Sequence, residues 1–298
     1  MIKLHEVGLR DGLQMESLVI PTETKYEWIK KLASTEIDVL QVGSFVNPKR
    51  MPQMADTDEL FKLLKNSNDF ENITFSGLVL NEKGYDRAVD CGVELICIGV
   101  SASDTHSTKN TGKSTNDALD EVLLICKNAI DNNQKIQASV QSAFGCGFEG
   151  KIDEEKVINI AKKYINNGIM NISLADTAGH ANPWQVERIF KAIKNYNNDV
   201  NFTCHFHNTY GMGLANCYAA LNSGVTTFET AFGGLGGCPF TKLAAGNVCT
   251  EDFVHFIQNQ ELRNDIDLLQ LIDFTKIIAD YFKRELPGFI YKSGPIKK

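Results

Sequence analysis

Residues 170–207 read MNISLADTAGHANPWQVERIFKAIKNYNNDVNFTCHFH. Two short apolar runs, at 170–175 and 201–207, are bounded by Asn, Asp and Gly residues and flank an amphipathic pattern at 183–196. Strands that are buried on both faces have this composition, and a helix of this length between them is the usual parallel crossover. The stretch therefore predicts one strand–helix–strand unit of a parallel sheet.

The same unit recurs in both directions along the chain. Further strands are expected at 2–7, 38–42, 74–80, 95–100, 137–142 and 226–231, with helices at 22–33, 116–130, 153–167 and 213–222. Eight strands, each followed by a helical stretch, favour a closed (β/α)8 barrel, a TIM barrel, over an open sheet. An extra C-terminal helical segment is expected at 268–282, and turns are expected at 81–84 and 91–92.

The bulk properties of the chain limit its organisation and its partners. No linker or low-complexity stretch divides the 298 residues, so residues 1–298 are expected to form a single barrel domain. A net charge of −7 argues against binding to nucleic acid or to an anionic membrane surface. No secretory signal and no apolar run of about 18 residues is seen. The eight cysteines form no Cys-x-x-Cys pair, which favours reduced thiols and a cytoplasmic protein.

Polar residues follow the first expected strand, where a barrel enzyme places its active site. The segment from Gly8 to Gln14 reads Gly-Leu-Arg-Asp-Gly-Leu-Gln. Asp11 is a hard oxygen ligand for a metal, and Arg10 can stabilise developing negative charge. A turn with an incidental ion pair explains the same residues equally well.

Two histidines close the seventh expected strand in the sequence His205-Phe206-His207. Side chains two apart on a strand point to the same side, so both imidazoles can reach one metal while Phe206 points away. Two polar residues at a strand end are the alternative, but the pairing favours a metal site. Asn208 is expected to cap or orient the turn that follows.

A glycine-rich segment, Gly-Gly-Leu-Gly-Gly-Cys-Pro at 233–239, follows the eighth expected strand. Cys238 suggests a proton donor on a mobile loop, although a passive cysteine in a glycine-rich hairpin fits too. Asn247 can add an amide oxygen to two imidazoles and a carboxylate, a set that suits Mg²⁺ or Mn²⁺ and leaves Zn²⁺ or Co²⁺ open. Asp176, at the end of the sixth strand, is a candidate second carboxylate. The other histidines, at 5, 106, 180 and 255, are interpreted as structural or surface residues.

Taken together, these segments resemble the 3-hydroxy-3-methylglutaryl-CoA (HMG-CoA) lyase family, part of a superfamily of barrel metallo-lyases and Claisen-type synthases such as isopropylmalate and homocitrate synthases. The matching segments lie in family order at 6–14, 43–54, 173–179, 205–211, 233–239 and 246–252. They span nearly the whole chain. The glycine-rich cysteine segment and Ser44-Phe-Val-Asn-Pro-Lys49 look like the lyase branch rather than the synthases.

The resemblance implies a role for each position. It implies a divalent metal, Mg²⁺ or Mn²⁺, held by Asp11, His205, His207 and Asn247. It implies that Arg10 stabilises an enolate, that Cys238 supplies the proton that quenches it, and that Asp176 and His205 belong to the catalytic set. Substrate-binding residues would be Arg10, Gln14, Gln41, Ser44 and Asp176. The implied reaction is retro-Claisen cleavage of a short 3-hydroxyacyl-CoA, in a homodimer.

Three positions depart from the pattern usual in that family. Gln41 and Asn208 stand where Glu and Asp are usual, and Glu16-Ser17 stands near a typical Lys that is associated with the CoA phosphates. The reaction class is therefore better defined than the substrate. The alternatives are a lyase for a different 3-hydroxyacyl thioester, a Claisen-type synthase acting on a 2-keto acid, and a weakly active homologue retained for binding.

Overall fold

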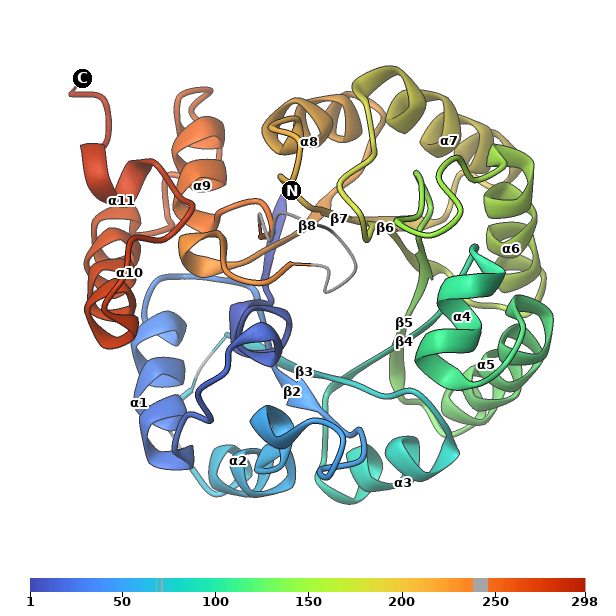
Figure 1. Ribbon diagram of the computed structural model, residues 1–298, viewed down its shortest axis with the longest axis horizontal. Helices are drawn as coiled ribbons and strands as arrows, with labels where there is room; N and C mark the ends of the chain where they lie inside the picture. Colours follow the sequence, from blue (N-terminus) through green and yellow to red (C-terminus); the bar gives the residue numbers. More distant parts are fainter. Residues whose placement is uncertain (68, 71, 238–245, 298) are drawn as a thin grey trace.

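The computed structural model describes residues 1–67, 69–70, 72–237 and 246–297, and its centre is a closed barrel of parallel strands (Figure 1). The strands are β1 (Lys3–Glu6), β2 (Val39–Ser44), β3 (Thr74–Leu78), β4 (Leu95–Ser101), β5 (Lys135–Gln141), β6 (Asn171–Asp176), β7 (Asn201–Phe206) and β8 (Thr227–Thr230). β1 pairs with β2 on one side and with β8 on the other, which closes the barrel. The predicted TIM barrel is confirmed.

Helices surround the barrel, and a C-terminal group lies outside the ring beside α1 (Figure 1). They are α1 (Thr22–Ala33), α2 (Thr57–Lys65), α3 (Glu82–Asp90), α4 (Asp104–Thr111), α5 (Thr115–Asp131), α6 (Glu154–Asn166), α7 (Pro183–Tyr196), α8 (Gly213–Asn222), α9 (Thr250–Gln258), α10 (Leu268–Phe282) and α11 (Ile290–Ser293). Shorter turns are the π-helix η1 (Gly8–Gly12) and the 3₁₀ turns η2 (Leu13–Met15), η3 (Pro52–Met54) and η4 (Phe232–Gly234). No helix in the described ranges combines the length and apolarity that crossing a membrane requires.

The sequence located the long helices well and missed several short ones. The expected helices at 22–33, 183–196, 213–222 and 268–282 match α1, α7, α8 and α10 residue for residue. The turn expected at 81–84 is wrong, because these residues begin α3. Asn81 Oδ1 accepts a hydrogen bond from the Gly84 amide at 3.0 Å, so Asn81 is the N-cap of that helix. An Asn–Gly pattern serves turns and helix caps by the same side-chain chemistry.

The barrel keeps its apolar core between strands and helices and places polar groups inside. Phe228 of β8, for example, stacks on Phe253 of α9 with ring centroids 4.7 Å apart, and both rings are fully buried. Burial of each such side chain contributes about 2 kcal/mol. Inside the barrel lie buried polar side chains, among them those of His5, Gln137 and Glu229. The apolar outer layer therefore supports a polar interior beneath the carboxyl ends of the strands.

Candidate active site

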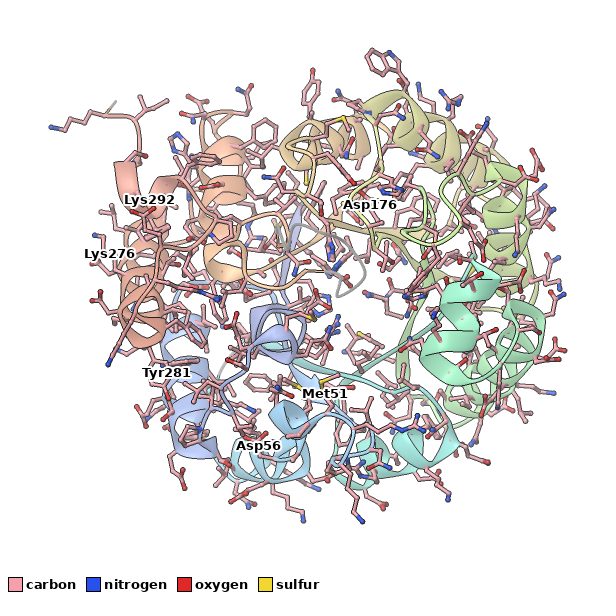
Figure 2. The ribbon with its side chains drawn as sticks, viewed as in Figure 1. Met51, Asp56, Asp176, Lys276, Tyr281 and Lys292 are labelled. Atoms are coloured by element: carbon pink, nitrogen blue, oxygen red, sulfur yellow. The ribbon has the colours of Figure 1, made fainter. Side chains whose placement is uncertain are left out.

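A cavity of about 370 Å³ opens at the carboxyl ends of the strands. Its lining includes the polar residues Arg10, Asp11, His205 and His207. Apolar residues also line it, among them Met15, Val46, Met51, Leu78 and Leu80. In Figure 2, Met51 and Asp176 mark opposite sides of the barrel opening.

A π-helical turn presents Arg10 and Asp11 to the cavity. The Val7 carbonyl accepts hydrogen bonds from the Asp11 amide at 2.7 Å and from the Gly12 amide at 3.4 Å, which widens the first turn after β1. Such turns are rare and often occur at functional sites. A Cβ on Gly8 would lie 2.5 Å from the Phe232 ring, so only glycine lets this turn approach η4 so closely.

Asp11, His205 and His207 come together as an Asp–His cluster, as the sequence predicted. The two imidazole Nε2 atoms lie 3.1 Å apart, and Asp11 Oδ2 lies 3.8 Å from that of His205 and 3.7 Å from that of His207. All three side chains are buried, and among the described residues this is the group of His, Cys, Asp and Glu that could hold a metal ion. Phe206 points away and packs on Phe144, as the strand alternation predicted.

Asn247 lies beside this cluster because its segment forms an antiparallel bridge with His207. Its Nδ2 donates to Asp11 Oδ2 at 2.8 Å, while its buried Oδ1 has no hydrogen-bond partner in the described ranges. Its Nδ2 also donates to the Leu235 carbonyl at 2.9 Å, so Asn247 would offer its oxygen to a cation only after the amide turned over. A Cβ on Gly236 would lie 2.5 Å from Asn247 Nδ2, so the glycine leaves this space open. Two imidazoles, a carboxylate and the side-chain amide of Asn247 are a donor set that fits a divalent cation.

The charges in the cluster suit a cation. Burial opposes ionisation of Asp11, but Arg10 and the two imidazoles outweigh it and hold the pKa of Asp11 well below its usual range. Burial also disfavours charge on both histidines. It lowers the pKa of His207, whereas hydrogen bonding to Glu229 and the nearby Asp11 raise the pKa of His205. Asp11 is thus a carboxylate across the neutral pH range, as a metal ligand must be.

Arg10 contacts one predicted substrate-binding residue, Gln41, and one predicted metal ligand, Asp11. Its Nε donates to Gln41 Oε1, and its Nη1 pairs with Asp11 Oδ1. Gln14 Nε2 donates to the same Asp11 oxygen at 3.0 Å. Ser44 lines the cavity and its hydroxyl donates to the Leu78 carbonyl at 3.3 Å. Arg10, Gln14, Gln41 and Ser44 all reach the cavity.

Comparison with known proteins relates this geometry to a family. The HMGL-like family model matches residues 1–278. The chain is 35% identical to a hydroxymethylglutaryl-CoA lyase of Bacillus subtilis, over 96% of this chain and 95% of that protein. It is 34% identical to an (R)-citramalyl-CoA lyase of Chloroflexus aurantiacus, over 99% of this chain and 95% of that protein. The chain belongs to the HMGL-like family.

A solved structure agrees with this placement. An HMG-CoA lyase from Acinetobacter baumannii, in complex with coenzyme A and 3-methylmalate, superposes with a TM-score of 0.92 at 35% identity, over 100% of this chain and 96% of that one. This HMGL-like protein is a carbon–carbon lyase.

Asp176 of this HMGL-like lyase ends β6 but does not line the cavity. Its Oδ1 accepts from the His180 amide at 2.8 Å and its Oδ2 from the Ala181 amide at 3.1 Å, so both oxygens hold the turn that leads to α7. Its neighbours Ala175 and Thr177 do line the cavity. Burial raises the pKa of Asp176 to about 7. The geometry thus brings Asp176 next to the site without direct exposure to it.

Cys238 lies outside the described residues. The last described residue before it, Gly237, lines the cavity. Asn208 behaves as expected, because its Oδ1 accepts from the Gly213 amide at 2.9 Å and thereby orients the start of α8.

Sequence reasoning missed Glu229, a buried carboxylate beneath the Asp–His cluster. Its Oε2 lies 2.9 Å from His205 Nδ1, and its Oε1 accepts from Gln137 Nε2 at 2.5 Å. His5 Nδ1 lies 3.4 Å from the same Oε1, so His5 belongs to this interior network. A charged residue inside an expected barrel strand was the available signal, because a buried carboxylate needs a partner. His106 also lines the cavity, which the sequence did not indicate.

A second set of buried acids, the Glu6–Glu251 cluster, holds the loops around the site rather than the site itself. Glu6 Oε1 accepts from the amides of Gly8 at 2.6 Å and Phe232 at 3.1 Å, and its Oε2 accepts from the Thr250 hydroxyl. Both oxygens of Glu251 lie 3.1 Å from the Gly233 amide. Burial raises the pKa of Glu6 to about 8 and that of Glu251 to about 7. The cluster ties η1, η4 and α9 together.

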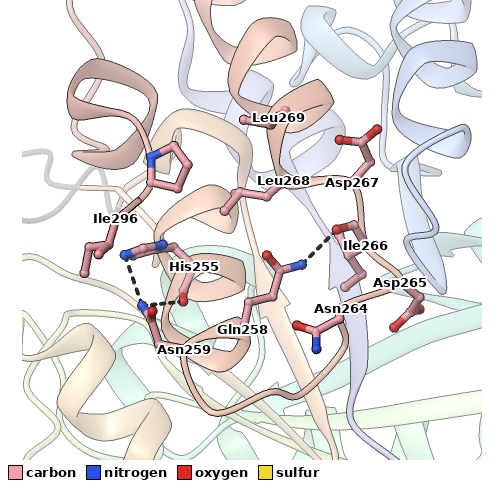
Figure 3. A pocket seen from close by; sticks show the side chains of 11 residues that line it. His255, Gln258, Asn259, Asn264, Asp265, Ile266, Asp267, Leu268, Leu269 and Ile296 are labelled. Carbon is pink, nitrogen blue, oxygen red and sulfur yellow. Dashed lines mark hydrogen bonds between the residues drawn. The ribbon is translucent and has the colours of Figure 1, made fainter. Parts of the chain in front are cut away.

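A second pocket, of about 530 Å³, lies between α9, α10 and the C-terminal segment (Figure 3). Its polar side chains largely satisfy one another or the backbone. His255 Nε2 lies 3.1 Å from Asn259 Nδ2, and Gln258 Nε2 donates to the Ile266 carbonyl at 2.8 Å. It lies away from the Asp–His cluster, so the barrel cavity is the candidate active site despite its smaller volume.

Proposed function

We propose that this lyase cleaves 3-hydroxy-3-methylglutaryl-CoA, or a closely related 3-hydroxyacyl-CoA, to acetyl-CoA and acetoacetate or the corresponding keto acid, with a divalent metal. The observation that supports this best is the Asp–His cluster with Asn247 beside Arg10, at the carboxyl ends of the strands. The similarity to HMG-CoA lyases supports an acyl-CoA substrate, and so does the similar HMG-CoA lyase structure in complex with coenzyme A and 3-methylmalate.

Asp11, His205, His207 and Asn247 are proposed to hold Mg²⁺ or Mn²⁺. The metal would supply Lewis acidity toward the substrate's 3-hydroxyl oxygen and terminal carboxylate. Each ligand has its position from a different local cause: the π-helical turn for Asp11, the strand alternation for the histidines, and the bridge to His207 for Asn247.

The reaction needs one proton removed and one proton returned. The 3-hydroxyl proton leaves, the bond between C2 and C3 breaks, and its electron pair stays on C2 as the enolate of acetyl-CoA. Arg10 is proposed to stabilise the enolate oxygen, since its guanidinium lies at the cavity beside Asp11. Asp176, whose pKa is raised to about 7, is the proposed acceptor of the hydroxyl proton; to reach the substrate its carboxyl group must turn from the His180 and Ala181 amides into the cavity. Cys238, which follows Gly237 in the chain, is the proposed donor of the proton to C2.

Two acyl groups are candidates for the substrate. Gln41 is neutral and accepts from Arg10, so Arg10 there has no carboxylate partner other than Asp11 among the described residues. The relative named as an (R)-citramalyl-CoA lyase makes a different 3-hydroxyacyl-CoA the second candidate.

The direct test is to incubate the purified protein with Mn²⁺ or Mg²⁺ and a panel of 3-hydroxyacyl-CoAs and to follow keto-acid release. We expect cleavage of HMG-CoA or of one close analogue, and loss of activity on chelation. Absence of cleavage of every member, with thiol reductant present, would rule the lyase function out. A Cys238→Ser variant should retain Mn²⁺ binding and turn over far more slowly; equal turnover would exclude Cys238 as the proton donor.

A homodimer is the proposed assembly. The outward face of α10 exposes Leu269, Ile277 and Tyr281, which offers an apolar surface for a second copy (Figure 2 labels Tyr281). Sedimentation equilibrium at micromolar concentration should give twice the mass of one chain, and a monomer at that concentration would contradict the proposal.

A further inference from the structure

We propose that Glu229 is a positioning residue for the metal: its carboxylate fixes the His205 ring so that Nε2 faces Asp11 and His207. The inference rests on the proposed metal-dependent function and adds a residue to it. Glu229 does not belong to the ligand set. It would act through His205 alone.

The geometry places Glu229 and the Asp–His cluster on opposite sides of one ring. Glu229 Oε2 lies 2.9 Å from His205 Nδ1, while His205 Nε2 lies 3.1 Å from the Nε2 of His207. A neutral imidazole has one N–H, and a carboxylate at Nδ1 keeps the proton on that nitrogen. The lone pair of Nε2 is then directed at the point that the other ligands also face, which is the arrangement of metal-binding histidines in general.

Glu229 is itself held by neighbours that fix its direction. Gln137 Nε2 donates to Glu229 Oε1 at 2.5 Å, and Gln137 Oε1 accepts from the Thr203 hydroxyl at 3.2 Å. The amide of Gln137 is thereby oriented with its donor toward Glu229. His5 Nδ1 approaches the same Oε1 at 3.4 Å. One carboxylate oxygen is occupied by these groups, so the other is left for His205.

The carboxylate has a specific role that a neutral group of the same shape cannot fill. In a Glu229→Gln variant the new amide must place an N–H either against the Gln137 donor or against His205 Nδ1. While Gln137 keeps its donor toward this position and its oxygen toward the Thr203 hydroxyl, the new N–H faces His205. His205 Nδ1 must then accept, and its proton moves to Nε2, where it blocks a cation.

The test compares Mn²⁺ affinity, measured by calorimetry without substrate, in the parent, in Glu229→Gln and in Ser76→Ala. A residue that hydrogen-bonds to the second ring nitrogen of a metal-binding histidine typically contributes about 10-fold to 100-fold in metal affinity. The Glu229→Gln variant should lose Mn²⁺ affinity by that factor. Ser76→Ala is the matched control. Ser76 Oγ contacts His5 Nε2 at 2.8 Å and is also buried, but it is linked to His205 only through His5 and Glu229. It should bind Mn²⁺ within about twofold of the parent.

Two results would overturn the proposal: unchanged Mn²⁺ affinity in Glu229→Gln, or an equal loss in Ser76→Ala, which would indicate a general disturbance of the barrel interior. If the Glu229→Gln variant does not fold, a measurement on the unaltered protein tests the proposal instead. NMR of the Mg²⁺-loaded protein with ¹⁵N-labelled histidine should show the His205 proton on Nδ1. The His205 signal is assigned because it is missing from the spectrum of the His205→Asn variant. An Nδ1 without a proton would refute the proposal. A parent that binds neither ion would instead remove the metal site itself, and with it the proposed function.

Discussion

Two groups of buried acids lie near the same end of the barrel, and their pKa values are shifted in opposite directions. Asp11 and Glu229 face imidazole and guanidinium groups, which lower the pKa of Asp11 well below its usual range and that of Glu229 to about 2 despite burial. Glu6 and Glu251 face backbone amides and hydroxyl groups, and burial raises their pKa values to about 8 and about 7. The first pair is anionic at neutral pH, whereas Glu6 stays mostly protonated.

The difference shows that buried acids in one region can have two roles, metal binding and the support of loops. A carboxylate that must meet a cation needs charged neighbours that keep it ionised. A carboxyl group that only has to hold loops can accept backbone hydrogen bonds and keep its proton, which avoids an uncompensated buried charge. Substitutions in the Asp–His cluster should therefore change metal binding and turnover, and substitutions in the Glu6–Glu251 cluster should change stability.

The largest effect is expected from Asp11→Asn. The substitution keeps the shape but removes the charge that faces both imidazoles and Arg10, so metal binding and catalysis should fail together. We expect a fall of about 10³-fold in kcat/KM, with a parallel loss of Mn²⁺ affinity, because the metal's electrostatic contribution is several kcal/mol. Keto-acid release and calorimetry would measure both. A variant that binds Mn²⁺ normally would place the metal elsewhere.

Arg10→Lys should separate metal binding from catalysis. Lysine retains a positive charge but loses the fork by which Arg10 contacts both Gln41 and Asp11, so the charge is no longer fixed at the enolate position. We expect kcat to fall by about 10²-fold, as when one group that stabilises developing charge is removed. Mn²⁺ affinity should stay within about threefold. A loss confined to KM would show that Arg10 binds substrate rather than stabilising the enolate.

Much of this arrangement could be predicted from sequence because a parallel barrel gathers its strand ends in one place. Asp11, His205 and His207 follow or end their strands, so closure gathers them at one end of the barrel. Glu229 was missed and His5 was interpreted only as a structural or surface residue, because both lie within strands and only the barrel register shows that they meet inside. Asp176 was placed correctly at its strand end, yet the direction of its carboxylate depends on the turn at His180 and Ala181. The π-helical turn after β1 has no sequence pattern that distinguishes it from an ordinary turn.

Glu6→Gln should reduce the pH dependence of stability. In the unfolded chain the pKa of Glu6 is near its ordinary value of 4.5, whereas burial in the folded protein raises it to about 8. The free energy of unfolding of the parent therefore falls as pH rises through this window, and a glutamine, which cannot ionise, removes that part of the fall.

Denaturant unfolding at pH 5 and pH 8 would measure this. We expect the loss between the two pH values to be smaller in Glu6→Gln by about 1–3 kcal/mol. Asp176, whose pKa is also raised, titrates in both proteins and cancels in the comparison. The charge of Glu251 helps to raise the pKa of Glu6, so this coupling is part of the measured difference. Glu59→Gln, on the exposed face of α2, is the control and should leave the dependence unchanged. An identical loss in Glu6→Gln and the parent would mean that Glu6 is ionised in the folded protein.

The smallest effect is expected from Thr250→Val, which tests whether the two groups of acids are independent. The Thr250 hydroxyl bonds to Glu6 Oε2 and to Thr230 Oγ1, the latter at 2.8 Å, and the side chain is fully buried. Valine has nearly the same shape and leaves Glu6 one partner short, at a cost of about 1 kcal/mol. In a chain of this size that corresponds to a fall in Tm of about 2–4 °C. Because Thr250 does not touch the Asp–His cluster, the Mn²⁺ affinity of the variant should match that of the parent. A tenfold loss of Mn²⁺ affinity with an unchanged Tm would show that the Glu6–Glu251 cluster also sets the geometry of the metal ligands.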